Sequence, residues 1–477
     1  MAIKNLRSHL SKEAAGRKNS PLKSAFKYYG KDNIVFLGGG LPMADYFPWE
    51  KIEASSPAPP FTTPAGIAEK PSVTGNEVKT ILEKGPTGKL DIPLARSLQY
   101  GHTDGQPELK EFFREHTEII HHPPYKEWDI ILTIGSTEAW DATLRTFCDP
   151  NDYVLVEEHA FSSAIETARA LNVNFVPVPM DEYGIIPEQM AEILDNWDSS
   201  KPLPKILYTV PTGQNPTGSS LSNERRKEIY ALACKYDFII IEDEPYYFLQ
   251  MGEYSKEQDA TKLPVPTHEQ FLKSLVKSFL SIDVEGRVVR LDSCSKVLGP
   301  GTRLGWIIAQ QELLERYVRV HEVTIQSASG FTQSIVNGLL QRWGQDGYID
   351  WLIGLRKEYT IKRDFTIHCL EKYMPDVVSW TPPVAGMFFT VVIDAAKHPD
   401  FATKYDSDPK KLETAIYEKA IEKGALMIPG SWFNVPDCEL SKTTKFFYRG
   451  TYAAVDLPKL DVGIHRFGDA VKDIFKL

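Results

Sequence analysis

The run Arg290-Leu-Asp-Ser-Cys-Ser-Lys-Val-Leu-Gly-Pro-Gly-Thr-Arg-Leu-Gly-Trp306 connects two short apolar segments, residues 288–291 and 304–308. Segments of this length without alternating polar residues are typical of strands that a sheet buries on both faces. The glycines of the connection follow Lys296 instead of lying between a strand and a helix, so the run does not match a dinucleotide-binding turn. Among the polar side chains of the connection are Ser293, Ser295, Lys296 and Arg303.

Further segments of the same apolar kind precede this run along the chain. They lie at residues 130–134, 153–156, 205–210 and 238–241. Helical patterns fall between them, for example at residues 138–147 and 223–236. Strands that alternate with helices predict a layered α/β domain with a mostly parallel sheet.

The remainder of the chain predicts a smaller lobe and several attachments. A proline-rich stretch at residues 55–71 is typical of an extended covering segment. The polar residues 251–287, which end in a helix-like run at 269–282, predict an insertion near the mouth of the site. From residue 348 onward the pattern predicts a small α+β lobe with a long helix, a strand within 386–393 and a helix at 409–423. The expected division is an N-terminal arm (1–30), a covering segment with part of the small domain (31–95), a large domain (96–344) and a small C-terminal domain (345–477).

Composition excludes several classes of protein. A net charge of −10 disfavours a general nucleic-acid binder, because such proteins need clustered basic residues. Five cysteines without a C-x-x-C pair favour reduced thiols and the cytoplasm. No apolar run approaches the roughly 18 residues of a membrane span. The basic residues near the N-terminus favour a surface arm over a mitochondrial presequence; they are Lys4, Arg7, Lys12, Arg17 and Lys18.

Lys296 is the residue that suggests a chemistry. A partly desolvated lysine amine can bind an aldehyde as a Schiff base. Serine hydroxyls and the guanidinium of Arg303 can bind a phosphate on the same molecule. Pyridoxal 5'-phosphate (PLP) carries both groups, so the pattern favours a PLP site. The alternative is a solvated lysine in an ordinary glycine-rich turn.

Two upstream features suit the same cofactor. Gly135, Ser136 and Thr137 follow a predicted strand and open a helix, where backbone N–H groups attract a phosphate; an ordinary helix cap is the alternative. Phe161 follows the next strand and can stack on a flat ring, although core packing also explains it.

Polar residues follow two later strands. Asn215, in Pro211-Thr-Gly-Gln-Asn-Pro-Thr-Gly218, can donate from its amide to a phenolate oxygen, or can belong to a plain turn. Asp243 ends the segment 238–241, where a buried carboxylate needs a partner such as a pyridinium nitrogen; a helix cap is the alternative. Tyr246 can reach the phenolate oxygen or pack in the core.

Arg449 lies in an apolar strand of the small lobe, where its guanidinium can bind a substrate carboxylate or form a structural ion pair. Tyr100 lies in a predicted turn, where it is either a surface residue or, if a phosphate lies close, a phosphate ligand. Four aromatic residues are candidates for a substrate pocket or for the core: Tyr28, Phe388, Trp432 and Phe433. The eleven histidines form no H-E-x-x-H motif, so no metal site is expected, and no G-x-S-x-G motif marks a serine hydrolase.

Taken with their order along the chain, these motifs resemble those of the fold-type-I PLP aminotransferases of class I/II. The fungal aromatic amino acid aminotransferases that also act on 2-aminoadipate are the most similar group, and the animal kynurenine/aminoadipate aminotransferases are similar but more distant. The resemblance extends from about residue 19 to the end. The motifs that carry it are Phe36-Leu-Gly-Gly-Gly-Leu-Pro42, Asp45-Tyr-Phe-Pro48, Glu242-Asp-Glu-Pro-Tyr-Tyr-Phe-Leu-Gln250, Pro429-Gly-Ser-Trp-Phe433 and Phe447-Tyr-Arg-Gly-Thr-Tyr-Ala-Ala454.

The resemblance implies a seven-stranded mixed sheet, a role for each candidate and a homodimer with a shared active site. Lys296 is then the Schiff-base lysine and proton shuttle, and Arg449 binds the substrate α-carboxylate while Gly40 lies over the substrate. Asp243 binds the ring nitrogen. Ser136, Thr137, Ser293 and Arg303 bind the phosphate with Tyr100 of the other subunit, and Asn215 and Tyr246 bind the phenolate oxygen. Phe161 and Thr137 stand where relatives often have tyrosine and glutamine, and both keep the expected role.

The implied activity is transamination of aromatic amino acids, kynurenine or 2-aminoadipate, with 2-oxoglutarate as amino acceptor. A PLP β-lyase on the same fold is one alternative. A PLP-binding transcriptional regulator is another, but it would need a DNA-binding module, and the N-terminal arm is too short and shows no helix-turn-helix pattern.

Overall fold

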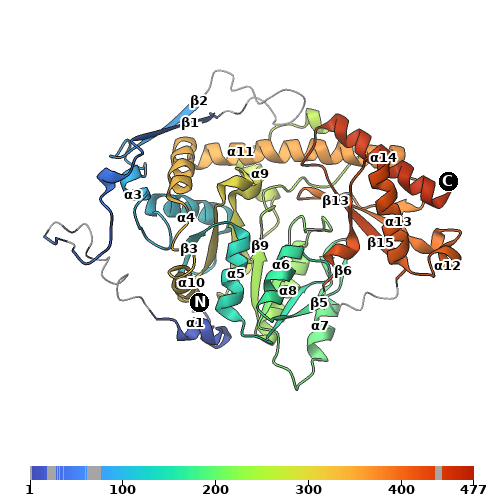
Figure 1. Cartoon of the computed structure of the whole chain (residues 1–477), viewed down its shortest axis with the longest axis horizontal. Coiled ribbons are helices and arrows are strands. Elements are labelled where there is room, and N and C mark those ends of the chain that lie inside the picture. The colour runs from blue at the N-terminus through green and yellow to red at the C-terminus, as the bar shows by residue number, and fades with distance from the viewer. Residues whose placement is uncertain are drawn as a thin grey trace.

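A seven-stranded sheet forms the centre of the large lobe (Figure 1). The computed structural model describes residues 3–18, 28, 31, 33–35, 37–59, 61, 77–435 and 443–477. The strand order is β3-β11-β10-β9-β8-β4-β5, and β11 alone runs antiparallel to its neighbours. The predicted α/β architecture with a mixed, mostly parallel sheet is therefore confirmed. The strands are β3 (Trp128–Thr133), β4 (Tyr153–Glu157), β5 (Asn174–Val178), β8 (Ile206–Thr209), β9 (Ile239–Asp243), β10 (Val288–Ser293) and β11 (Gly305–Gln310).

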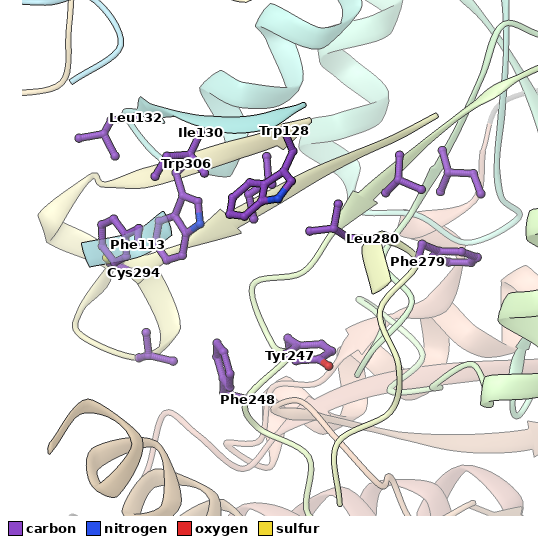
Figure 2. Close-up of a cluster of buried hydrophobic side chains, with 14 of the residues drawn as sticks. Phe113, Trp128, Ile130, Leu132, Tyr247, Phe248, Phe279, Leu280, Cys294 and Trp306 are labelled. Atoms are coloured by element: carbon purple, nitrogen blue, oxygen red, sulfur yellow. The ribbon is translucent and has the colours of Figure 1, made fainter. Parts of the chain in front are cut away.

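Helices cover both faces of this sheet because its strands are apolar at successive positions. Ile240 belongs to one buried cluster, whereas its neighbours Ile239 and Ile241 belong to the cluster on the opposite face. In the first cluster the ring of Phe113 stacks on Trp306, with centroids 3.9 Å apart (Figure 2). The helices of the large lobe are α3 (Leu94–Ser97), α4 (Pro107–His121), α5 (Ser136–Phe147), α6 (Ser162–Ala170), α7 (Pro187–Asp195), α8 (Asn223–Tyr236), α9 (His268–Ser274) and α10 (Gln311–His321).

The small lobe is a four-stranded sheet with helices packed against it, and the long helix α11 (Gly330–Tyr373) runs from the large lobe to it (Figure 1). Gly344 interrupts α11 with a φ of 65°, which is a backbone conformation that favours glycine. The remaining elements are β12 (Val378–Ser379), β13 (Phe388–Asp394), α12 (Phe401–Lys404), α13 (Pro409–Glu422), β14 (Ile428–Pro429), β15 (Lys445–Thr451) and α14 (Leu457–Phe475).

The structure differs from the expectations in three elements. The helix-like run at 269–282 is only the short helix α9 followed by a turn, because the backbone N–H groups of Phe279 and Leu280 donate to the Glu242 carboxylate at 2.7 and 3.3 Å. The long helix begins at Gly330, earlier than expected. Strand β5 was not anticipated, since Pro177 lies within it.

A hairpin covers part of α11 near the proline-rich stretch. Strands β1 (Lys51–Pro57) and β2 (Glu77–Glu83) pair antiparallel, and the indole of Trp343 donates to the Pro57 carbonyl at 2.8 Å. Residues 55–57 thus belong to a strand, while residues 60 and 62–71 of the predicted covering segment lie outside the described residues. Two short strands, β6 (Met180–Asp181) and β7 (Gly184–Ile185), form a second small hairpin.

The basic N-terminal arm packs on the large lobe. Leu6 is fully buried in the cluster that contains α5 and α10, and the short helix α1 (Lys12–Gly16) follows it. The hydroxyl of Ser11 donates to the Arg145 carbonyl at 2.6 Å, and the Lys4 N–H donates to the Glu285 carbonyl at 2.8 Å. Of the helices that the structure describes, none has the length and hydropathy needed to cross a membrane.

We expect Leu6→Ala to lower the free energy of unfolding by about 2–4 kcal/mol, because the substitution leaves a cavity in a packed cluster. The adjacent Arg7→Ala is the matched control: the Arg7 side chain is 70% exposed, and loss of its surface ion pair with Glu312 should cost less than about 1 kcal/mol. Equilibrium urea unfolding measures both. Equal effects of the two substitutions would show that the arm does not contribute to the core.

Candidate active site

A cavity of about 360 Å³ lies where β8, β9 and β10 end. The strands run parallel, so their carboxyl ends meet at one edge, the usual ligand site of such sheets. Residues of α5, α6, β13 and β15 complete the wall. Twelve of the predicted residues line this cavity: Ser136, Thr137, Phe161, Asn215, Asp243, Tyr246, Ser293, Ser295, Lys296, Arg303, Phe388 and Arg449.

The last residue of β9, Asp243, holds a buried carboxylate against the cavity. Its side chain is 7% exposed, and the hydroxyl of Tyr208 donates to Oδ2 at 2.8 Å. Oδ1 is buried and has no hydrogen-bond partner among the described residues. Burial raises the pKa of Asp243 to about 6, while the hydrogen bond from Tyr208 lowers it. The carboxyl is therefore mostly ionised at neutral pH and has one free acceptor oxygen.

Lys296 ends the 3-10 turn Cys294–Lys296, which directly follows β10. Its side chain is half-buried, and its Nζ lies 6.0 Å from the centre of the Tyr246 ring. Burial and then the positive charge of Arg303 lower the pKa of Lys296, whereas Asp243 raises it. The amine consequently loses its proton more easily than a solvated lysine does.

Arg303 and the N-terminus of α5 form a cationic concavity. The guanidinium donates to the carbonyls of Ile134 and Pro300 at 2.9 and 3.0 Å. Gly135 has a φ of 97°, and a Cβ there would lie 2.3 Å from Arg303 Nη2. Because the helix start also presents unpaired N–H groups, the concavity suits an anion such as a phosphate.

The serine hydroxyls of this concavity differ in their hydrogen bonds. Ser293 Oγ donates to Ser295 Oγ at 2.8 Å, and Arg303 Nη1 lies 3.5 Å from the same oxygen. The Ser136 hydroxyl is buried without a hydrogen bond of good geometry, and its proximity lowers the pKa of Asp243. Its backbone N–H, at the first residue of α5, is one of the donors that have no partner within the helix and is available to an anion.

Arg449 extends from β15 into the cavity between two aromatic rings. Its Cζ lies 4.5 Å from the centre of the Phe388 ring and 4.6 Å from that of Phe433. Nη1 donates to Asn215 Oδ1 at 2.6 Å. No carboxylate of the described residues lies within ion-pair distance of it, so the structural ion pair considered from the sequence is absent from this part of the chain. The stacked guanidinium retains donors for an incoming carboxylate.

Five predicted residues are not among those that line the cavity. Tyr100 is 58% exposed, and Gly40 is exposed within the segment 37–59. Of the four aromatic candidates, Phe388 lines the cavity and Phe433 packs on Arg449. Trp432 is 56% exposed and packs on Tyr417, and Tyr28 is not among the lining residues.

The sequence did not indicate two further residues that line the cavity beside Asp243, Tyr208 and Trp140. Tyr208 lies inside β8 and Trp140 inside α5, and their rings contact each other 4.3 Å apart by centroid. The signal for Tyr208 was a hydroxyl in a mostly apolar strand, since a buried hydroxyl needs a partner. Trp140 gives no comparable signal, because a tryptophan on a helix face is ordinarily a core residue.

Known proteins share this architecture over the whole chain. Residues 94–467 match the family model for aminotransferase class I and II. The chain is 43% identical to an aromatic amino acid aminotransferase of Schizosaccharomyces pombe, with 99% of each chain covered. It is 32% identical to the mitochondrial kynurenine/alpha-aminoadipate aminotransferase of Rattus norvegicus, over 98% of this chain and 100% of that one. The crystal structure of the aminotransferase Aro8 from Candida albicans superposes with a TM-score of 0.94 at 54% identity and covers 100% of both chains. The chain belongs to the class I and II aminotransferase family.

Proposed function

We propose that this chain is a PLP-dependent aminotransferase that transfers the amino group of aromatic amino acids, kynurenine and 2-aminoadipate to 2-oxoglutarate. The observation that carries the proposal is the pairing, in one cavity, of a lysine with a lowered pKa and a buried carboxylate with one unpartnered oxygen. Names of the relatives support the substrates: aromatic amino acids in Schizosaccharomyces pombe, kynurenine and alpha-aminoadipate in Rattus norvegicus.

The residues of the cavity fit each polar group of PLP. The anion-binding concavity at Gly135 and Arg303 fits the phosphate, and Asp243 Oδ1 fits the protonated ring nitrogen. Lys296 would attach to the aldehyde, with Asn215 and Tyr246 as donors to the phenolate oxygen. When bound, PLP withdraws electrons from the Cα of an attached amino acid.

The roles of the chain's own residues follow from their positions. Arg449, fixed by Asn215 and two phenyl rings, orients the α-carboxylate of the substrate. The half-buried amine of Lys296, whose pKa is lowered, would accept the Cα proton of the substrate and would serve as the proton carrier between the two carbons. Asp243, ionised at neutral pH, would keep the ring nitrogen protonated. Phe161, directly before α6, would cover one face of the ring.

A half-reaction screen tests this function. Purified protein loaded with PLP is mixed with tryptophan, phenylalanine, tyrosine, kynurenine or 2-aminoadipate, and the loss of the cofactor's visible absorbance is followed. We expect pyridoxamine phosphate and the 2-oxo acid to form in equal amounts, and added 2-oxoglutarate to restore the starting spectrum.

Arg449→Lys should raise the donor concentration that gives half the maximal rate about tenfold or more for every donor, because lysine lacks the planar, two-pronged guanidinium that binds a carboxylate.

The same screen separates the alternatives. A β-lyase would release ammonia without accumulating pyridoxamine phosphate, and a regulator would bind amino acids without turnover. Either result, with correctly folded and loaded protein, would contradict the proposal. If only some of the amino donors react, the substrate range is narrower than proposed, but the assignment of transamination stands.

We also infer that the protein is a homodimer whose active sites are shared. Tyr100 and Gly40, outside the cavity of their own chain, are then available to the cavity of the other subunit. Large exposed apolar side chains in and just before the segment that contains Gly40 support a buried interface: Val35, Leu37 and Tyr46 are 84%, 90% and 77% exposed.

Sedimentation equilibrium at micromolar concentration should give twice the mass of one chain. Leu37→Glu should shift the protein toward the monomer, because it places a charge in an apolar interface, whereas Val265→Glu, at a 71% exposed position elsewhere, should not. A monomeric wild-type protein with full activity would contradict the shared site.

The composition, with five cysteines and no C-x-x-C pair, supports a cytoplasmic location. Activity on 2-aminoadipate would give the enzyme a role in lysine biosynthesis.

A further inference from the structure

Tyr208 and Asp243 lie on the same face of neighbouring parallel strands. Tyr208 of β8 pairs with Ile241 of β9, and Asp243 follows Ile241 by two residues. Because side chains alternate along a strand, Asp243 continues the face of Ile241, which shares a buried cluster with Tyr208. This register places the phenol hydroxyl 2.8 Å from Asp243 Oδ2.

Tyr208 is held so that it can act only as a donor to the carboxylate. Its side chain is 1% exposed, and burial, followed by the charge of Asp243, raises the pKa of Tyr208 well above its ordinary value. The ring packs against Trp140, whose indole N–H donates to the Ala164 carbonyl at 3.1 Å. The hydroxyl therefore keeps its proton and its direction.

The hydrogen bond has two consequences for the carboxylate. It occupies Oδ2, so that Oδ1, which is buried and has no partner among the described residues, is the oxygen left for a ligand. It also favours the ionised form against the cost of burial. Without it the carboxyl group is free to rotate about its Cβ–Cγ bond and holds its proton to higher pH.

We propose that Tyr208 is a positioning residue, whose hydroxyl fixes the Asp243 carboxylate so that Oδ1 binds the ring nitrogen of the cofactor. The inference rests on the proposed function, because it needs a cofactor with a protonated ring nitrogen in the cavity. Tyr208 also lines the cavity, but its hydroxyl is directed to Asp243, and we propose that it acts on the cofactor only through that carboxylate.

A comparison of two cofactors isolates this effect. Protein freed of cofactor is titrated by calorimetry with PLP and with the analogue that carries carbon in place of the ring nitrogen. The ratio of the two dissociation constants measures the interaction between Asp243 and the nitrogen. We expect wild-type protein to prefer PLP, and Tyr208→Phe, which keeps the ring and removes the hydroxyl, to reduce that preference about tenfold.

Tyr317→Phe is the matched control. Tyr317 is equally buried in the same lobe, and its hydroxyl forms a 2.9 Å hydrogen bond with Thr143 that is remote from Asp243. The control should leave the cofactor preference unchanged even if it lowers the melting temperature. Circular dichroism of each variant verifies the fold before titration.

The possible results separate failure of the role of Tyr208 from failure of the proposed function. A wild-type protein without preference for PLP would refute the role of Asp243, and with it this part of the proposed function. A preference that Tyr208→Phe retains in full would refute only the role of Tyr208. Equal weakening of both cofactors by Tyr208→Phe would mean that the tyrosine supports the fold alone, which also overturns the inference.

Discussion

Parallel strands that end together are the constraint on which the site depends. Leu291 of β10 pairs with Asp243 of β9, so the chain that follows β10 begins beside the carboxylate. Lys296 lies five residues beyond Leu291 and can therefore reach the same cavity. Arg303 returns to this edge in the turn before β11, the antiparallel strand. The sheet thus brings an amine, a carboxylate and an anion-binding concavity together without long flexible connections.

The buried carboxylate of Asp243 is stable at the end of β9 because neighbouring charged residues form a connected set of ion pairs. Glu242 and Glu244, on either side of Asp243, point to the opposite face and form ion pairs with Arg226 at 3.2 and 3.3 Å. Arg290 contacts Glu242 at 3.2 Å from the neighbouring strand. Removing one member of such a fully buried network costs several kcal/mol, so the network fixes the end of β9. Asp243 alone directs its free oxygen to the cavity.

The sequence predicted the strand ends better than their connections. Uniformly apolar segments identify buried strands, so six of the seven central strands and the polar residues that follow them were found. The segment 269–282 was misjudged because its backbone donors bind Glu242, a long-range contact that periodicity does not encode. The aromatic stack on Arg449 was missed for the same reason, since Phe388 and Phe433 are 45 residues apart in sequence. Tyr208 was hidden in a mostly apolar strand, although its hydroxyl, like that of the adjacent Thr209, required a partner.

Covalent trapping tests the central claim most directly, namely that these strand ends assemble a site in which Lys296 attaches the cofactor. Protein loaded with PLP is reduced with borohydride, digested and analysed by peptide mass spectrometry. We expect one modified peptide, the one that contains Lys296. The modification should be lost in Lys296→Ala and kept in the control Lys235→Ala, whose substituted lysine is 58% exposed. A modification on another lysine, or one spread over exposed lysines, would contradict it.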